Sequence, residues 1–143
     1  MVNSSVVVDT SLAVKWVLIE TDSSDARRLR ERWRRDGVQP IVPSWFACEV
    51  ANVLYQRLRA GRYTLPEIRR SLGEVLTFVA VRDFEAVVAD RGLEIAALLG
   101  QKASYDAHYV ALAERAGCDL WTADERFWNA AKGAFPRVRW LHE

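Results

Sequence analysis

The chain carries almost no net charge and has no long apolar run, and each absence limits what the protein can be. Its 143 residues include 20 basic and 19 acidic side chains, so the formal net charge of +1 neither supports nor excludes a polyanionic partner. No run approaches the roughly 18 apolar residues that span a bilayer, and the amino terminus lacks a basic segment followed by an apolar stretch. We therefore expect a cytoplasmic protein without a membrane partner.

Cysteine and histidine are also scarce. Cys48 and Cys118 fall in segments that we expect to lie in the core, and no close Cys/His spacing of a structural zinc site occurs. We expect His108 and His142 to pack in the core or on the surface, not to bind zinc or act as bases. Nucleophile elbows, phosphate-cradling glycine loops and the dinucleotide fingerprint are absent, so serine hydrolases, P-loop proteins and Rossmann oxidoreductases lose support.

Strand-like and helix-like segments alternate along the chain. With 50% hydrophobic residues, the sequence is long enough for one well-buried domain over residues 1–143. Short apolar runs predict strands at residues 5–8, 41–42, 79–81, 119–122 and 138–141. Amphipathic segments predict helices at residues 10–16, 24–36, 44–60, 64–78, 84–99, 104–116 and after 124. This order predicts an α/β fold with a mostly parallel sheet covered by helices on both faces.

Short polar side chains mark the expected starts of these helices. Thr64 is the strongest of them, because Pro66 stands near the first helical position and Glu67 follows Thr64 by three residues. We also expect side-chain caps at Thr10 or Ser11, at Ser44 and at Ser104. Thr122-Ala123-Asp124-Glu125 resembles a capping box that begins at Thr122.

Two acids follow predicted strands. The apolar run 6–8 ends at Asp9, and Leu120-Trp121-Thr122 is followed by Ala123 and Asp124. In open parallel sheets, ligands bind beyond the carboxyl ends of the strands. Asp9 and Asp124 therefore fall on the edge of the sheet where we expect a site.

Two further acids lie on the apolar sides of predicted helices. Glu49 shares a helical row with Phe46 and Val53, and Asp106 shares one with Tyr109 and Val110. Burying a lone carboxylate costs several kcal/mol or more, unless the group is paired, neutralised or bound to a metal. Four acids that converge on one cation would meet this requirement, and a set of carboxylate oxygens suits Mg²⁺ or Mn²⁺.

Each acid also has an ordinary structural interpretation. Asp9 fits a turn or a helix cap, whereas Asp106 and Asp124 fit first-turn acids that favour a helix dipole. Glu49 would need a buried partner such as Arg57 or Arg59. The combination of two strand-end acids with two inward helical acids favours the functional interpretation.

The arginine-rich segment 27–35 suggests a nucleic-acid patch, but its pattern favours a solvated helix face. Ala26, Leu29 and Trp33 form an inward row, and acids interleave with the arginines. Phosphate contact is the alternative. Trp16 and Trp45 are candidate base-stacking surfaces, because they lie close in sequence to Asp9 and Glu49.

Four segments together resemble the PIN-domain nucleases, and the length and spacing look most like the VapC-type toxins of toxin–antitoxin pairs. They are Val-Val-Val-Asp-Thr-Ser at 6–11, Glu49 in the helix after Pro43-Ser44, Ser-Tyr-Asp-Ala-His-Tyr at 104–109, and Leu-Trp-Thr-Ala-Asp at 120–124. The resemblance covers essentially the whole chain, and its last two segments are the most specific.

The resemblance implies a three-layer α/β/α PIN-like domain over residues 1–143 and a metal-dependent endoribonuclease. It implies that the acidic quartet Asp9, Glu49, Asp106 and Asp124 is catalytic and binds Mg²⁺ or Mn²⁺. It further implies a supporting hydroxyl near the metal from Thr10, Ser11 or Thr122. Some members carry another acid shortly after the position of Asp124, where this chain has Glu125 and Arg126. The resemblance therefore leaves the number of bound metal ions, one or two, open. The implied partners are an RNA substrate, a cognate antitoxin and a second copy of the chain.

Two other functions compete with this interpretation. A phosphatase or phosphotransfer domain would use Asp9 as a covalent nucleophile, although Ser11 stands where haloacid-dehalogenase-like enzymes need a second Asp, and Lys132 is poorly placed for a receiver domain. A non-catalytic module would keep the acids for metal-dependent folding or docking. The mechanism that fits the quartet best is metal-assisted hydrolysis of a phosphodiester.

Overall fold

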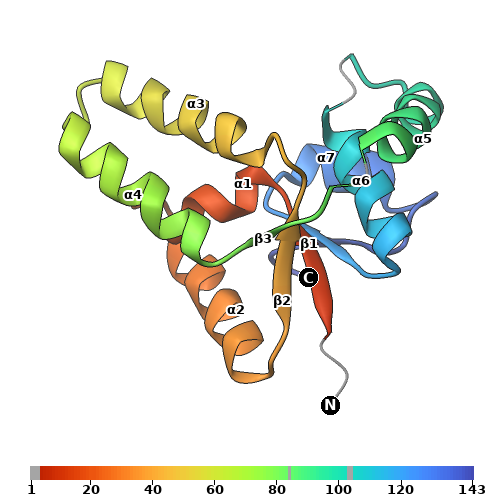
Figure 1. Ribbon diagram of the computed structural model, residues 1–143, viewed down its shortest axis with the longest axis horizontal. Helices are drawn as coiled ribbons and strands as arrows, with labels where there is room; N and C mark the ends of the chain where they lie inside the picture. Colours follow the sequence, from red (N-terminus) through yellow and green to blue (C-terminus); the bar gives the residue numbers. More distant parts are fainter. Residues whose placement is uncertain (1–3, 84, 103–104) are drawn as a thin grey trace.

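A computed structural model describes residues 4–83, 85–102 and 105–143 of the chain (Figure 1). Five strands form one sheet in the order β3-β2-β1-β4-β5, and all four neighbouring pairs are parallel. The strands are β1 (Ser5–Val8), β2 (Gln39–Val42), β3 (Ala80–Val81), β4 (Leu120–Thr122) and β5 (Val138–Trp140). The predicted α/β class and the predicted strands are therefore confirmed.

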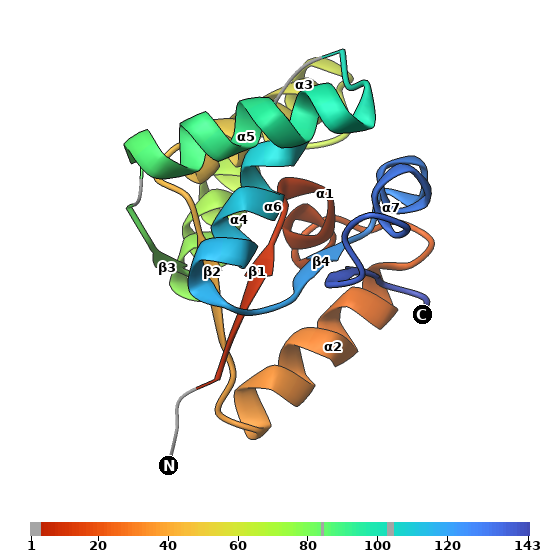
Figure 2. The ribbon, with the colours of Figure 1, turned by 90° about the vertical axis from the view of Figure 1, so that its right-hand side faces the viewer.

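Helices connect each strand to the next and cover both faces of the sheet, as parallel pairing requires. Figure 1 shows α2 and the α3–α4 pair on one side, and Figure 2 shows α5 and α6 in front of the other. The helices are α1 (Thr10–Ala13), the 3-10 turn η1 (Val14–Trp16), α2 (Ser23–Arg35), α3 (Phe46–Arg59), α4 (Leu65–Thr77), α5 (Glu85–Leu99), α6 (Tyr105–Ala116) and α7 (Glu125–Ala131). None of those in the described ranges has the length and apolar character that a membrane crossing needs.

The core lies between the central strands and the inner faces of these helices. Val7 and Val8 are fully buried, because β1 is covered on both faces. The arginine-rich helix α2 buries Ala26, Leu29 and Trp33, as its pattern predicts, and leaves most of its arginines exposed. Cys48 was predicted to lie in the core, but it is exposed on α3, whereas Cys118 is half-buried. The helical row that buries Phe46 and Val50 turns position 48 outward.

The predicted helix starts are partly correct. Thr64 and Glu67 form the predicted capping box. The Glu67 N–H donates to the Thr64 hydroxyl oxygen, and the Thr64 N–H donates to the Glu67 carboxylate. Thr10 and Ser11 do not cap α1; Asp9 does, because its extended backbone lets its carboxylate accept from the Leu12 N–H. The helix α3 begins at Phe46, two residues after Ser44, and Trp45 at its start makes no side-chain cap.

The last predicted cap is shifted as well. The carboxylate of Asp124 accepts from the Phe127 N–H at 3.1 Å, so Asp124 caps α7 rather than Thr122. The predicted cap at Ser104 lies outside the described residues, as does Phe84, where the preceding helix was expected to begin.

Candidate metal centre

Asp9 lies directly beyond the end of β1 and is only 3% exposed. Its Oδ1 accepts hydrogen bonds from the Ser11 hydroxyl at 2.7 Å and the Leu12 N–H at 3.0 Å. Its Oδ2 accepts from the Thr122 hydroxyl at 2.5 Å. Both oxygens of this buried carboxylate are thus held by neighbouring groups.

These hydrogen bonds do not fully offset the burial of Asp9. Burial raises its pKa to about 7, against the lowering effect of Thr122, Ser11 and the Leu12 N–H. The negative charge of Asp106 raises it further. Asp9 therefore keeps a proton more readily than a free carboxyl does, and a bound cation would offset its charge when it is ionised.

Asp124 and Thr122 lie at the end of β4, next to β1 in the sheet. The Asp124 N–H donates to Thr122 Oγ1 at 3.0 Å, and the Ala123 N–H donates to Ser11 Oγ at 3.1 Å. The hydroxyls of Ser11 and Thr122 are themselves 3.2 Å apart. Two of the three hydroxyls singled out in the sequence therefore join the ends of β1 and β4 around Asp9.

Asp106 is half-buried in the first turn of α6. Its pKa is raised to about 6, chiefly by burial and then by the charges of Asp124 and Glu49. Asp106 thus interacts electrostatically with each of the other three acids, since its charge also raises the pKa of Asp9.

Glu49 is half-buried on α3, and its partner is not an arginine. Tyr109 donates its hydroxyl hydrogen to Glu49 Oε1 at 2.5 Å, and the Thr10 hydroxyl lies 3.5 Å from the same oxygen. Arg57 instead contacts Glu20 at 3.0 Å, and Arg59 is exposed. The alternative in which Arg57 or Arg59 neutralises Glu49 is therefore not what the structure contains.

Tyr109 was missed as a site residue, because its position on α6 was assigned to an apolar row. It is 1% exposed, and its hydroxyl also lies 3.2 Å from Thr10 Oγ1. Burial and the charge of Glu49 raise its pKa. The sequence did contain a signal: a buried Tyr needs a partner for its hydroxyl, and Tyr109 follows Asp106 by three residues.

The donor chemistry of these four acids fits a hard divalent cation. They offer carboxylate oxygens, and three hydroxyls surround them, which is the ligand type that Mg²⁺ and Mn²⁺ prefer. A cation would also offset the repulsion that raises the pKa values of Asp9 and Asp106. As the side chains lie, no three His, Cys, Asp or Glu groups within the described ranges are close enough together to hold one ion.

The two histidines make other contacts. His108 packs edge-on against Trp45, with ring centroids 5.6 Å apart, and His142 lies 3.3 Å from Asp22. A cavity of about 720 Å³ opens beside Glu49; it is lined by Trp45, Cys48, Glu49, Asn52, Ala89, Tyr105 and His108. Solvent can therefore reach the side of Glu49 that faces this cavity.

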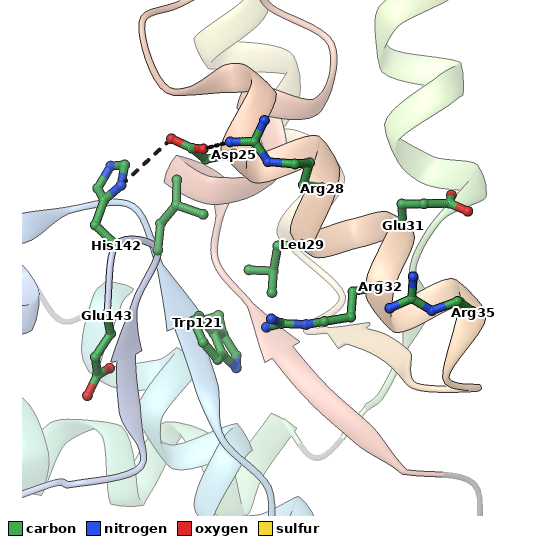
Figure 3. A pocket seen from close by; sticks show the side chains of 10 residues that line it. Asp25, Arg28, Leu29, Glu31, Arg32, Arg35, Trp121, His142 and Glu143 are labelled. Carbon is green, nitrogen blue, oxygen red and sulfur yellow. Dashed lines mark hydrogen bonds and ion pairs between the residues drawn. The ribbon is translucent and has the colours of Figure 1, made fainter.

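A second cavity, of about 620 Å³, lies along α2 on the arginine-rich face (Figure 3). Acids and arginines share its walls: Asp25, Arg28, Leu29, Glu31, Arg32, Arg35, Trp121, Leu141, His142 and Glu143. Asp25 pairs with Arg28 and also contacts His142 at 3.9 Å, and Arg34 pairs with Glu31. This paired, exposed surface agrees with the interpretation of α2 as a solvated helix face.

Comparison with known families now assigns the class of protein. The PIN-domain family model matches residues 6–133, so the chain belongs to the PIN-domain family. The resemblance noted in the sequence is therefore confirmed. No curated protein sequence matches the chain.

Several solved structures share the fold. PAE2754 of Pyrobaculum aerophilum is 24% identical, with a TM-score of 0.70 over 98% of this chain and 85% of that one. A toxin–antitoxin complex from Klebsiella pneumoniae is 17% identical, with a TM-score of 0.68 over 96% and 98%. VapC20 of Mycobacterium tuberculosis, described as a sarcin-ricin loop cleaving toxin, is 18% identical, with a TM-score of 0.66 over 94% and 98%. The chain is thus structurally similar to VapC toxins.

Proposed function

We propose that this PIN domain is a divalent-metal-dependent endoribonuclease, and that Asp9, Glu49, Asp106 and Asp124 are its metal-binding and catalytic acids. The observation that carries the proposal is the hydrogen-bond network in which Ser11 and Thr122 hold the buried Asp9 carboxylate between the ends of β1 and β4. The charge of Asp106 acts on this carboxylate, and the charges of Asp124 and Glu49 act on Asp106. PIN domains are typically metal-dependent nucleases, and this chain keeps the all-oxygen donor set that such chemistry requires.

The residues would divide the work as follows. Asp9, fixed by Ser11 and Thr122, would hold the ion from the sheet, and Glu49, fixed by Tyr109, would hold it from α3. Bound Mg²⁺ or Mn²⁺ supplies positive charge for the phosphate oxygens and makes a water molecule more acidic. The carboxylates would orient that water in line with the leaving oxygen.

The competing phosphotransfer function has less support. A covalent nucleophile must be reached by the phosphorus atom of the substrate, whereas Asp9 is almost fully buried. Asp9 Oδ2 accepts only the Thr122 hydroxyl, so this oxygen keeps a lone pair for a cation.

Cleavage of RNA by the purified protein tests the proposal. Mg²⁺ or Mn²⁺ should support cleavage, and excess chelator should stop it. Asp106→Asn should lower the rate by more than the roughly 100-fold that loss of an outer hydrogen-bond partner costs at a metal site. Asp90→Asn, which changes an exposed acid on α5, is the matched control and should leave the rate unchanged. Cleavage that persists in chelator would contradict the metal mechanism. An active Asp106→Asn protein with an unaltered circular dichroism spectrum would show that Asp106 is not one of the catalytic acids.

We further propose that the protein is the toxin of a toxin–antitoxin pair and acts as a homodimer. The structural similarity to VapC toxins and to a chain solved in a toxin–antitoxin complex supports the first part. A basic segment of an antitoxin would bind the clustered acids and suppress cleavage. Leu93 and Leu98, which are 64% and 67% exposed on α5, offer apolar surface for a second copy.

Growth and mass measurements test these two assignments. Expression alone should slow bacterial growth, and co-expression with the protein encoded by a neighbouring short reading frame should restore it. Equal growth in both cultures, with active protein verified, would contradict the toxin assignment. Light scattering should give twice the 16.3 kDa chain mass; a monomer at micromolar concentration would contradict the dimer.

A further inference from the structure

The two oxygens of the Glu49 carboxylate have different surroundings. Oε1 receives the Tyr109 hydroxyl at 2.5 Å and has the Thr10 hydroxyl at 3.5 Å. Within the described ranges, no donor lies within hydrogen-bond distance of Oε2. Both lone pairs of Oε1 therefore have donors inside the protein, whereas Oε2 has none among the described residues.

The donor to Oε1 is itself held in place. Tyr109 is 1% exposed, its hydroxyl lies 3.2 Å from Thr10 Oγ1, and its ring packs edge-on against Trp45 with centroids 6.2 Å apart. It stands on α6 one turn after Asp106, so one helix carries both a candidate ligand and the group that orients another. A buried, doubly anchored phenol of this kind fixes the carboxylate that it contacts.

The number of oxygens that a carboxylate offers to a metal ion affects which ion the site prefers. Mg²⁺ requires near-ideal octahedral geometry and takes single oxygens at about 2.0–2.1 Å. Ca²⁺ takes about six to eight oxygens at roughly 2.3–2.6 Å and readily accepts both oxygens of one carboxylate. A carboxylate with one oxygen already engaged therefore suits Mg²⁺ better than Ca²⁺.

We propose that Tyr109 is a positioning residue that presents Glu49 to the metal through one oxygen only, and that it thereby makes the centre prefer Mg²⁺ over Ca²⁺. The inference rests on the metal centre of the proposed function. It assigns a role in ion selectivity to a hydroxyl that is not itself a ligand.

Metal binding by Tyr109→Phe tests this role without any RNA. The substitution removes one oxygen atom and keeps the ring that packs against Trp45. Calorimetric titration of the metal-free protein should show Mg²⁺ affinity lower by about 10- to 100-fold. Ca²⁺ affinity should fall less, since the freed Oε1 becomes available to the larger ion. Tyr55→Phe, at a tyrosine that is 49% exposed on α3, is the control and should change neither affinity.

The outcomes separate this inference from the proposed function. A wild-type protein that binds neither ion would contradict the metal centre itself. A wild-type protein that binds Mg²⁺, beside a Tyr109→Phe variant with an unchanged ratio of the two affinities, would overturn only the role of Tyr109. An equal loss for both ions would do the same, because it would indicate a merely structural effect.

A second variant tests the same role if Tyr109→Phe does not fold. Thr10→Val removes the hydroxyl that contacts both Tyr109 and Glu49, with little change in shape. It should shift the affinity ratio in the same direction by a smaller factor, and an unchanged ratio would overturn the proposal. In a Glu49→Gln background, Tyr109→Phe should have no further effect on the ratio, since the second ligand oxygen is absent.

Discussion

Thr122 donates its hydroxyl hydrogen to Asp9 Oδ2 at 2.5 Å, and so joins two residues that are 113 positions apart in the chain. The same hydroxyl oxygen accepts the N–H of Asp124, the residue whose carboxylate caps α7. One buried side chain thus links the end of β1 to the end of β4 and orients two of the candidate ligands. Its contribution is measurable apart from any activity.

Thr122→Val should lower the free energy of unfolding by about 1–3 kcal/mol. The substitution preserves shape, but it leaves a buried carboxylate without one donor and a backbone N–H without its acceptor. Urea denaturation at neutral pH measures the change. Thr77→Val removes an exposed hydroxyl that bonds the Glu74 carbonyl, so it should change stability by no more than about 0.5 kcal/mol. Equal effects of the two substitutions would show that the bond to Asp9 contributes little.

The stability of the metal-free protein should fall as pH rises from about 4 to 7. The pKa values of Asp9 and Asp106 are raised from 3.8 to about 7 and about 6, so the folded protein keeps protons that the unfolded chain has already released. Their stabilising effect is complete below about pH 4 and is lost as pH rises through 6 and 7. Urea denaturation with chelator at several pH values measures this slope.

Asp106→Asn is the control for this slope, because it removes one of the two titrating groups and should flatten the fall. If instead the wild type became more stable across this interval, the raised pKa values would be wrong.

Glu49→Gln should stabilise the metal-free protein and reduce the stabilisation that Mn²⁺ gives. The charge of Glu49 is one of the causes that raise the pKa of Asp106, whereas Gln removes that charge and still accepts from Tyr109. An ion that binds only the folded state raises the melting temperature, and loss of a ligand shrinks this gain. Thermal melts with chelator and with Mn²⁺ measure both signs.

Glu74→Gln, at an exposed acid on α4, provides the comparison and should leave the Mn²⁺ response as in the wild type. A Glu49→Gln protein that is destabilised without metal, yet responds fully to Mn²⁺, would place Glu49 outside the centre.

Gly92→Ala should destabilise the protein, although alanine normally favours a helix. An added Cβ at this buried position of α5 would lie 2.5 Å from the His108 ring on α6, so the ring or the two packed helices would have to shift. Gly73→Ala is the matched control: it lies on α4 with nothing within 4 Å, and it should gain about 0.5–1 kcal/mol. Thermal melts of both variants should move in opposite directions, and a stabilised Gly92→Ala protein would show that this contact yields easily.

Strand positions followed from the sequence because parallel strands buried on both faces leave uninterrupted apolar runs. Val6 to Val8 and the run at residues 120–122 are of this kind, and both became strands beside one another. The inner row of α2 was equally readable, since Ala26, Leu29 and Trp33 repeat at helical spacing.

Caps and hydroxyl partners were less predictable, because they depend on contacts between distant segments. Asp9 took the capping role assigned to Thr10 or Ser11, and this left the Ser11 and Thr122 hydroxyls to bond its carboxylate. The bond from Tyr109 to Glu49 joins α6 to α3, and no local pattern specifies it. The assignment of the four acids as one metal centre stays a prediction.

The position of β4 in the sheet has a consequence for protein synthesis. This strand lies between β1 and β5, although it follows β1, β2 and β3 along the chain and is made after them. A partly translated chain would carry Asp9 and Glu49 but not the neighbours that complete their surroundings. Under the proposed function, chemistry at this edge would begin only after β4 has left the ribosome and docked beside β1, and translation would give the cell an interval in which to provide an inhibitor.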